Sequence, residues 1–90
     1  MATVAEILSA ADDSVTVIND INTNGSNSDY VFRGSTQDEI NEIVQRNVDH
    51  LEVILAYDGS NEKPDVAGSS EDKSSYNNAI TTGNAYIAAN

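Results

Sequence analysis

Residues 36–57, TQDEINEIVQRNVDHLEVILAY, contain the clearest folding signal in this chain of 90 residues. The stretch opens with Thr36 and Glu39, which have the spacing of a capping box, in which each side chain bonds the backbone amide of the other residue. Apolar residues then recur every three or four positions, as they do along one face of an α-helix. They are Ile40, Ile43, Val44, Val48, Leu51, Ile54 and Leu55. The pattern predicts an amphipathic helix over residues 36–57 that stops at Asp58-Gly59.

Two other stretches have the same helical period. The first opens with a second capping box at residues 3–6, and its apolar stripe predicts a helix over residues 3–20. The run VTVI at residues 15–18 is β-branched and would also suit a strand, but the continuity of the stripe favours the helix. The last stretch predicts a helix over residues 70–88, with Ser70 as its N-cap.

Two polar loops, at residues 20–35 and 58–69, join the three predicted helices. We therefore expect an all-α fold, a small three-helix bundle with two long polar loops. It forms a single domain over residues 1–90, because a chain of this length has room for only one core. Long loops in a compact domain are often committed to an interaction.

The charge of the chain is strongly one-sided, with fifteen Asp and Glu against four Lys and Arg, a net charge of -11. Direct binding to nucleic acid or to anionic membranes is disfavoured, because Lys and Arg provide the affinity for phosphate. No apolar run is long enough to span a membrane, and the N-terminus lacks the basic region of a secretory signal peptide. We expect a soluble protein that is intracellular or part of a virion and is not secreted by a signal peptide.

The first loop contains the sharpest candidate for a metal site, DINTNGSNSD at residues 20–29. Its first six residues have the D-x-N-x-N-G pattern that opens an EF-hand-type calcium loop. The candidate ligands are Asp20, Asn22, Asn24 and Asp29. The bidentate acid of such loops is missing, since Val31 occupies its position. Asn, Asp and Gly are also the residues that turns prefer, so we favour a polar turn over a weak calcium site.

Tyr30, Val31 and Phe32 form a short apolar cluster in the same loop. We expect this cluster to anchor the loop on the bundle and to provide an interface for other proteins. His50 is the only histidine, and its position at the border of the helical stripe predicts a role in packing. Phosphate-binding and hydrolase motifs are absent and the acids are scattered. We therefore expect no enzymatic activity and no cofactor other than the calcium considered above.

Three stretches of the chain resemble small uncharacterised proteins encoded by tailed bacteriophages. They are MATVAEILSAADD at residues 1–13, RNVDHLEVILAYD at residues 46–58 and AITTGNAYIAAN at residues 79–90. The resemblance implies a phage setting, in which small proteins without enzymatic activity are often virion components or inhibitors of host proteins. It transfers no functional residues to this chain.

Three functions follow as hypotheses. The first is a non-enzymatic protein–protein interaction module, such as a structural accessory of a phage capsid or tail. The second is an acidic inhibitor that mimics nucleic acid in a basic cleft of a host protein, since carboxylates can take the place of phosphates there. The third is a weak calcium-binding protein. The expected partners are other proteins, including virion subunits, and not nucleic acid or membranes.

Overall fold

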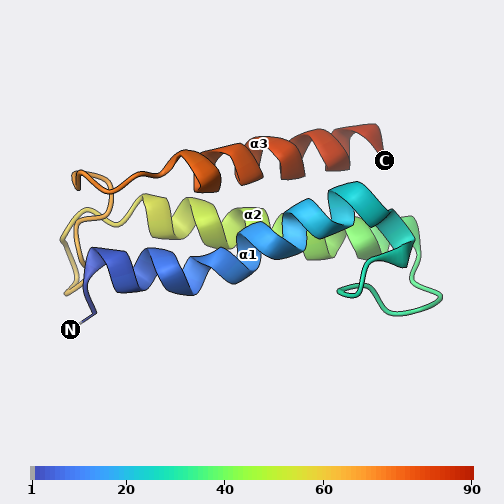
Figure 1. The fold of residues 1–90 in the computed structure, drawn as a ribbon, viewed down its shortest axis with the longest axis horizontal. Coiled ribbons are helices and arrows are strands. Elements are labelled where there is room, and N and C mark those ends of the chain that lie inside the picture. Colours follow the sequence, from blue (N-terminus) through green and yellow to red (C-terminus); the bar gives the residue numbers. More distant parts are fainter. Residues whose placement is uncertain (1) are drawn as a thin grey trace.

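The computed structural model describes residues 2–90, which fold into three long α-helices and one short 3-10 helix. The elements in chain order are α1 (Val4–Asn24), η1 (Gly25–Asn27), α2 (Gln37–Leu55) and α3 (Ser74–Ala89). The helices lie side by side in a rod of 41 × 21 × 18 Å, and α2 runs opposite to α1 and α3 (Figure 1). The predicted all-α, three-helix bundle is therefore confirmed.

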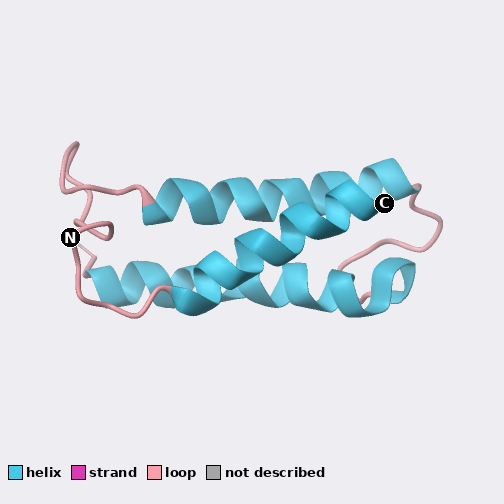
Figure 2. Ribbon diagram, turned by 90° about the horizontal axis from the view of Figure 1, so that it is seen from above, coloured by secondary structure: helices cyan, strands magenta, loops and turns pink. Residues whose placement is uncertain are grey.

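The two connections between helices lie at opposite ends of the rod, as Figure 2 shows. Residues 25–36 join α1 to α2 at one end, and residues 56–73 join α2 to α3 at the other. The long sides of the rod are therefore helix faces. Across residues 2–90, no helix is both long enough and apolar enough to cross a lipid bilayer.

Helix α1 is longer than the sequence pattern indicated. It starts as predicted, at the capping box of residues 3–6, whose two bonds measure 3.0 and 3.1 Å. Its end lies at Asn24 instead of residue 20, because Ile21 is fully buried and adds one more turn to the apolar stripe. Gly25, with a φ of 55°, then ends the helix, and its N–H donates to the carbonyl oxygen of Ile21.

Helix α2 follows its prediction closely. It spans Gln37–Leu55, and Thr36 and Glu39 form the expected capping box before it. Its buried positions are spaced three or four residues apart, and they are Ile40, Val44, Val48, Leu51 and Ile54. Each of the three helices packs against the other two, so these residues lie in one continuous core.

Helix α3 spans Ser74–Ala89 and begins later than the predicted residues 70–88. The predicted N-cap, Ser70, lies outside the helix, and Lys73 occupies the N-cap position, where its side chain makes no capping bond. Asp72 supplies a bond instead, because its carboxylate accepts from the amide N–H of the first helical residue at 2.9 Å.

The connection between α2 and α3 explains this late start. Val66 in its middle is fully buried, although the sequence pattern treats residues 58–69 as a polar loop. Burial of Val66 holds the chain against the end of the bundle, where the amide of Ala67 bonds the carbonyl oxygen of Tyr57 at 2.9 Å. Helix α3 therefore begins only after the chain has left this anchor.

Two tyrosine hydroxyls connect α3 to its neighbours. The Tyr76 hydroxyl donates to a carboxylate oxygen of Asp12 at 2.7 Å and lies 3.0 Å from the carbonyl oxygen of Leu8, both on α1. The Tyr86 hydroxyl accepts from Gln37 Nε2 on α2 at 3.0 Å. Because hydrogen bonds are directional, these contacts fix the rotation of α3 about its own axis over the aliphatic core.

Candidate functional site

Residues 25–36, which include η1, are termed the aromatic loop, because they contain Tyr30 and Phe32. The loop projects from the end of the rod that lies farthest from the N-terminus (Figure 1). It contains the candidate interface and one of the candidate calcium residues, Asp29, while the other three lie just before it in α1, so its geometry bears on both predictions.

A buried serine fastens the aromatic loop to α1. Ser28 is only 4% exposed, and its hydroxyl donates to Asp20 Oδ2 at 2.5 Å. The same hydroxyl accepts from the N–H of Tyr30 at 3.1 Å. The other carboxylate oxygen of Asp20 accepts from Asn24 Nδ2 at 3.0 Å. Both oxygens of Asp20 therefore have partners within the chain, and the loop is tied to the end of the helix.

This arrangement differs from the loop geometry on which the calcium prediction depended. Asp20, Asn22 and Asn24 all lie in α1, and in a helix residues two positions apart point about 200° apart around the axis. Asn22 therefore faces away from the other two, while Asp29 lies in the loop beyond η1. Within the described part of the chain, no group of three or more His, Asp or Glu could hold a metal ion. The polar turn that we favoured is likewise confined to the residues after Asn24.

Tyr30, Val31 and Phe32 divide into one anchor and two exposed rings. Val31 is half-buried and packs against the core. Tyr30 is 45% exposed, and Phe32 is 87% exposed. The carbonyl oxygen of Phe32 accepts from both the N–H and the hydroxyl of Ser35, at 3.1 and 2.7 Å. The backbone of Phe32 is therefore held in place while its ring stands in solvent.

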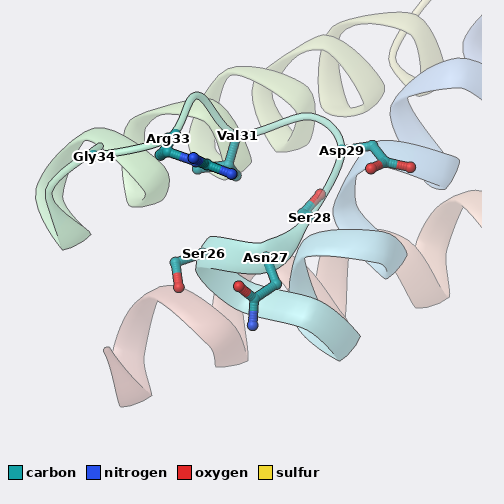
Figure 3. Close-up of a pocket in the computed structure, with 7 residues that line it drawn as sticks. All are labelled: Ser26, Asn27, Ser28, Asp29, Val31, Arg33 and Gly34. Carbon is teal, nitrogen blue, oxygen red and sulfur yellow. The ribbon is translucent and has the colours of Figure 1, made fainter.

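A hollow of about 480 Å³ lies between η1 and the arm of the loop that carries Phe32 (Figure 3). The residues that line it are Ser26, Asn27, Ser28, Asp29, Val31, Arg33 and Gly34. Val31 and Arg33 line the hollow from the same arm, whereas Phe32 between them does not. The lining combines hydroxyl, amide, carboxylate and guanidinium groups with a single branched apolar side chain. The hollow is therefore suited to polar contacts beside the exposed ring.

A second hollow of about 290 Å³ lies at the opposite end of the rod, where Lys63 Nζ is 5.5 Å from the centre of the Tyr57 ring. The turn beside it closes with a bond of 3.0 Å from the N–H of Lys63 to the carbonyl oxygen of Ser60. Its central residues, Asn61 and Glu62, have φ angles of 54° and 62°. This turn is of type I′, which prefers Gly at the second central position. The backbone at Glu62 is therefore strained, by about 1–2 kcal/mol.

Four carboxyl groups have a lowered pKa because they accept hydrogen bonds in helix caps and turns. They are Glu6, Glu39, Asp58 and Asp72. In each case, hydrogen bonds from a nearby Thr or Ser are the main cause of the lowered pKa. A catalytic acid–base pair instead needs two neighbouring groups whose pKa values are pushed apart. These four carboxylates belong to separate caps and turns along the rod, so their pKa shifts indicate structural roles.

His50 is exposed on α2, farther from the core than the packing border that the sequence pattern predicted. Val53, three residues later, is also exposed, at 58%. The same outward face includes Arg46, whose Nε donates to the backbone carbonyl oxygen of Glu42 at 3.4 Å. The apolar stripe of α2 therefore does not extend around the helix as far as His50, and the histidine side chain lies on the solvent-exposed face.

Two residues that shape the aromatic loop have no strong signal in the sequence. Ser28 is the buried fastener of the loop, and only its position two residues before Tyr30, which suits a serine turn, could have indicated this role. Arg33 supplies the guanidinium group in the lining of the hollow. Arg33 lines the hollow because of the path that the loop backbone takes, and the residue type alone does not indicate this path.

No protein-family model, curated protein or solved structure matches this chain. The resemblance of three stretches to tailed-phage proteins therefore stays a prediction from the sequence.

Proposed function

We propose that this protein is a non-enzymatic module that binds other proteins through its aromatic loop. Phe32 is the observation that carries the proposal, because its ring is 87% exposed at the end of the rod. Burial of a phenylalanine side chain contributes about 1.5–3 kcal/mol, and little of that is gained within the chain itself. Aromatic side chains that a partner buries are frequent anchors of protein interfaces.

The fastening of the loop supports this proposal. Ordering a free segment costs about 1–2 kcal/mol for the backbone of each residue, which weakens binding by flexible loops. In this loop, Ser28 already holds the amide of Tyr30, and Ser35 holds the carbonyl oxygen of Phe32. A partner would therefore meet rings whose backbone is fixed in advance.

The polar hollow beside the rings supplies the second part of an interface. Arg33 can donate hydrogen bonds to a partner, Asp29 can accept them, and Asn27 can do both. An apolar anchor bordered by polar groups is the usual arrangement of a protein–protein contact. The partner is expected to have an apolar pocket for Phe32 and hydrogen-bonding groups around it. In the phage setting that the sequence predicts, this partner would be a capsid or tail subunit.

The proposal is tested by capturing partners from the cells that produce the protein, with the wild type and two variants compared. Phe32→Ala should weaken the capture of any specific partner by at least about tenfold, because it removes the anchor. Val53→Ala is the matched control, since Val53 is another exposed apolar side chain, 58% exposed on α2. The free energy of unfolding of both variants should lie within about 0.5 kcal/mol of the wild-type value, because neither position is in the core.

Two results would overturn the proposal. One is capture of the same partner at unchanged strength by Phe32→Ala. The other is an equal loss of capture with Val53→Ala, which would place the contact on α2 or on the whole surface.

A further inference from the structure

Asn24 is the only asparagine in the chain that is followed by glycine. Asparagine is one of the chemically labile residues, because a backbone nitrogen can attack its side-chain amide. The attacking nitrogen belongs to the next residue, and glycine in that position leaves the approach open, since it has no side chain and a permissive backbone. The pair Asn24-Gly25 is therefore the most reactive asparagine site in the chain.

The structure places this pair at the end of α1. Asn24 is exposed, and Gly25 ends the helix with a φ of 55°. Asn24 Nδ2 donates to Asp20 Oδ1 at 3.0 Å, so the side-chain amide is held one turn back along the helix. The N–H of Gly25 donates to the carbonyl oxygen of Ile21. Both reacting groups are therefore engaged elsewhere while the last turn of α1 stays closed.

We propose that Asn24 is a site of spontaneous deamidation, and that the reaction releases the aromatic loop from α1. The Gly25 nitrogen gives its proton to solvent base and forms a bond to Cγ of Asn24. The bond from Cγ to Nδ2 breaks, Nδ2 takes up a proton and leaves as ammonia, and a cyclic succinimide remains. Water then opens this ring at either carbonyl carbon, which gives aspartate or isoaspartate.

Opening of the last turn of α1 sets the rate of this reaction. Asn22, Thr23 and Asn24 are exposed, and this turn has no basic residue to offset the negative end of the helix dipole. A helix end with few buried contacts opens at low cost. Each opening frees the N–H of Gly25, which is also what hydrogen exchange at this amide requires. The rates of deamidation and of exchange should therefore change together.

The reaction also acts on the residue that fastens the aromatic loop. Asp20 accepts from Asn24 at one carboxylate oxygen and from the Ser28 hydroxyl at the other. Deamidation turns the donor into a second carboxylate four residues away, and like charges at this spacing repel each other. Both carboxylates then lie at the negative end of the helix dipole, which destabilises the turn further. The last turn of α1 and the bond to Ser28 are therefore weakened together.

The loss of ammonia makes the change irreversible, so it distinguishes aged chains from newly made ones. A fixed loop backbone favours binding, and aged chains should therefore capture a partner less strongly. This effect on binding rests on the proposed function of the aromatic loop. The reaction itself and the loosening of the loop do not, and they can be measured without a partner.

The first test follows deamidation of the folded protein in mildly alkaline buffer by peptide mass spectrometry. Asn24 should react before every other asparagine, and unfolding in urea should accelerate its reaction at least about tenfold. Asp20→Ala should accelerate it at least about threefold in the folded protein, because the amide loses its acceptor, and exchange at the Gly25 amide should rise by the same factor. Asp13→Ala is the matched control, because Asp13 is exposed on the same helix and carries the same charge, and it should change both rates less than about twofold.

The second test supplies the product directly. Asn24→Asp introduces the new carboxylate, and Asn24→Gln is its control, because glutamine keeps an uncharged amide. Hydrogen exchange at the amide of Tyr30, whose N–H bonds the Ser28 hydroxyl, reports whether the loop is released. It should accelerate at least about threefold in Asn24→Asp and less than about twofold in Asn24→Gln.

Three results would overturn the proposal. The first is deamidation of other asparagines in the folded protein while Asn24 stays intact. The second is an equal rate at Asn24 in Asp20→Ala and Asp13→Ala. The third is unchanged exchange at Tyr30 in Asn24→Asp. Failure of the aromatic loop to capture a partner would contradict the proposed function and leave all three measurements unaffected.

Discussion

Replacement of Gly83 by alanine tests how closely the three helices pack. A Cβ atom at this position would lie 2.5 Å from Val48 Cγ2, 3.3 Å from Val44 Cγ1 and 3.4 Å from Ile18 Cγ2. Non-bonded carbon atoms prefer about 3.5–4.0 Å, so the first contact is a clash and the other two leave no direction of escape. Val48 is fully buried and β-branched, and it has essentially one rotamer in a helix, so it cannot turn aside.

Two opposing effects determine the change in the free energy of unfolding. Alanine stabilises a helix by about 1 kcal/mol relative to glycine. Overpacking a tight core costs about 1–3 kcal/mol, and the stiff surroundings of Gly83 place this case in the upper part of that range. We expect Gly83→Ala to destabilise the protein by about 1–2 kcal/mol. For a domain of this size, that lowers the melting temperature by roughly 5–15 °C.

Urea unfolding monitored by circular dichroism measures the effect, and a double-mutant cycle locates its cause. Val48→Ala removes the methyl group that the new Cβ would meet. The loss of unfolding free energy in the double variant should therefore be smaller than the sum of the losses in the two single variants, by at least about 1 kcal/mol. Stabilisation by Gly83→Ala of about 1 kcal/mol, as at an exposed helical glycine, would refute the close approach of α3. Additive effects of Gly83→Ala and Val48→Ala on the free energy of unfolding would refute it as well.

Three other changes test the fold and the candidate site. Burial raises the pKa of Tyr76 from 10.0 to about 12, so its neutral hydroxyl stabilises the fold below pH 10, and this contribution is lost as the pH rises through 12. In thermal melts, the Tyr76→Phe variant should therefore lose less stability than the wild type between pH 10 and pH 12. Glu62→Gly should raise the free energy of unfolding by about 1 kcal/mol in urea, because glycine adopts a positive φ without strain; a loss of stability would show that the turn is relaxed. Asp20→Ala removes the acceptor of the Ser28 hydroxyl, so hydrogen exchange at the amide of Tyr30, which Ser28 bonds, should accelerate at least about tenfold. Unchanged exchange at this amide would show that the loop is fixed by other contacts.

The helical elements could be predicted where several local signals agreed. Residues 36–39 form a capping box, and the stripe that follows has buried residues at every expected position. The start of α1 was predicted for the same reason. Helical period and capping depend on residues three or four positions apart, so they can be read without knowledge of the rest of the fold.

The ends of the helices next to the connections could not be predicted in the same way. Helix α1 continues past Asp20 because Ile21 finds a place in the core, and α3 starts late because Val66 also does. Both are single apolar residues in polar surroundings. Whether such a residue is covered depends on which other helix lies over it, and a local pattern does not contain that information.

The candidate site shows the same division. By itself the sequence determined that three amphipathic helices form and that the chain is acidic. The tertiary structure decided that Asp20 fastens a loop through Ser28, that Val31 anchors this loop and that Phe32 stays exposed. The physical reason is that helix formation is governed by neighbours along the chain, whereas burial is governed by elements that are far apart in sequence and meet only in the folded molecule.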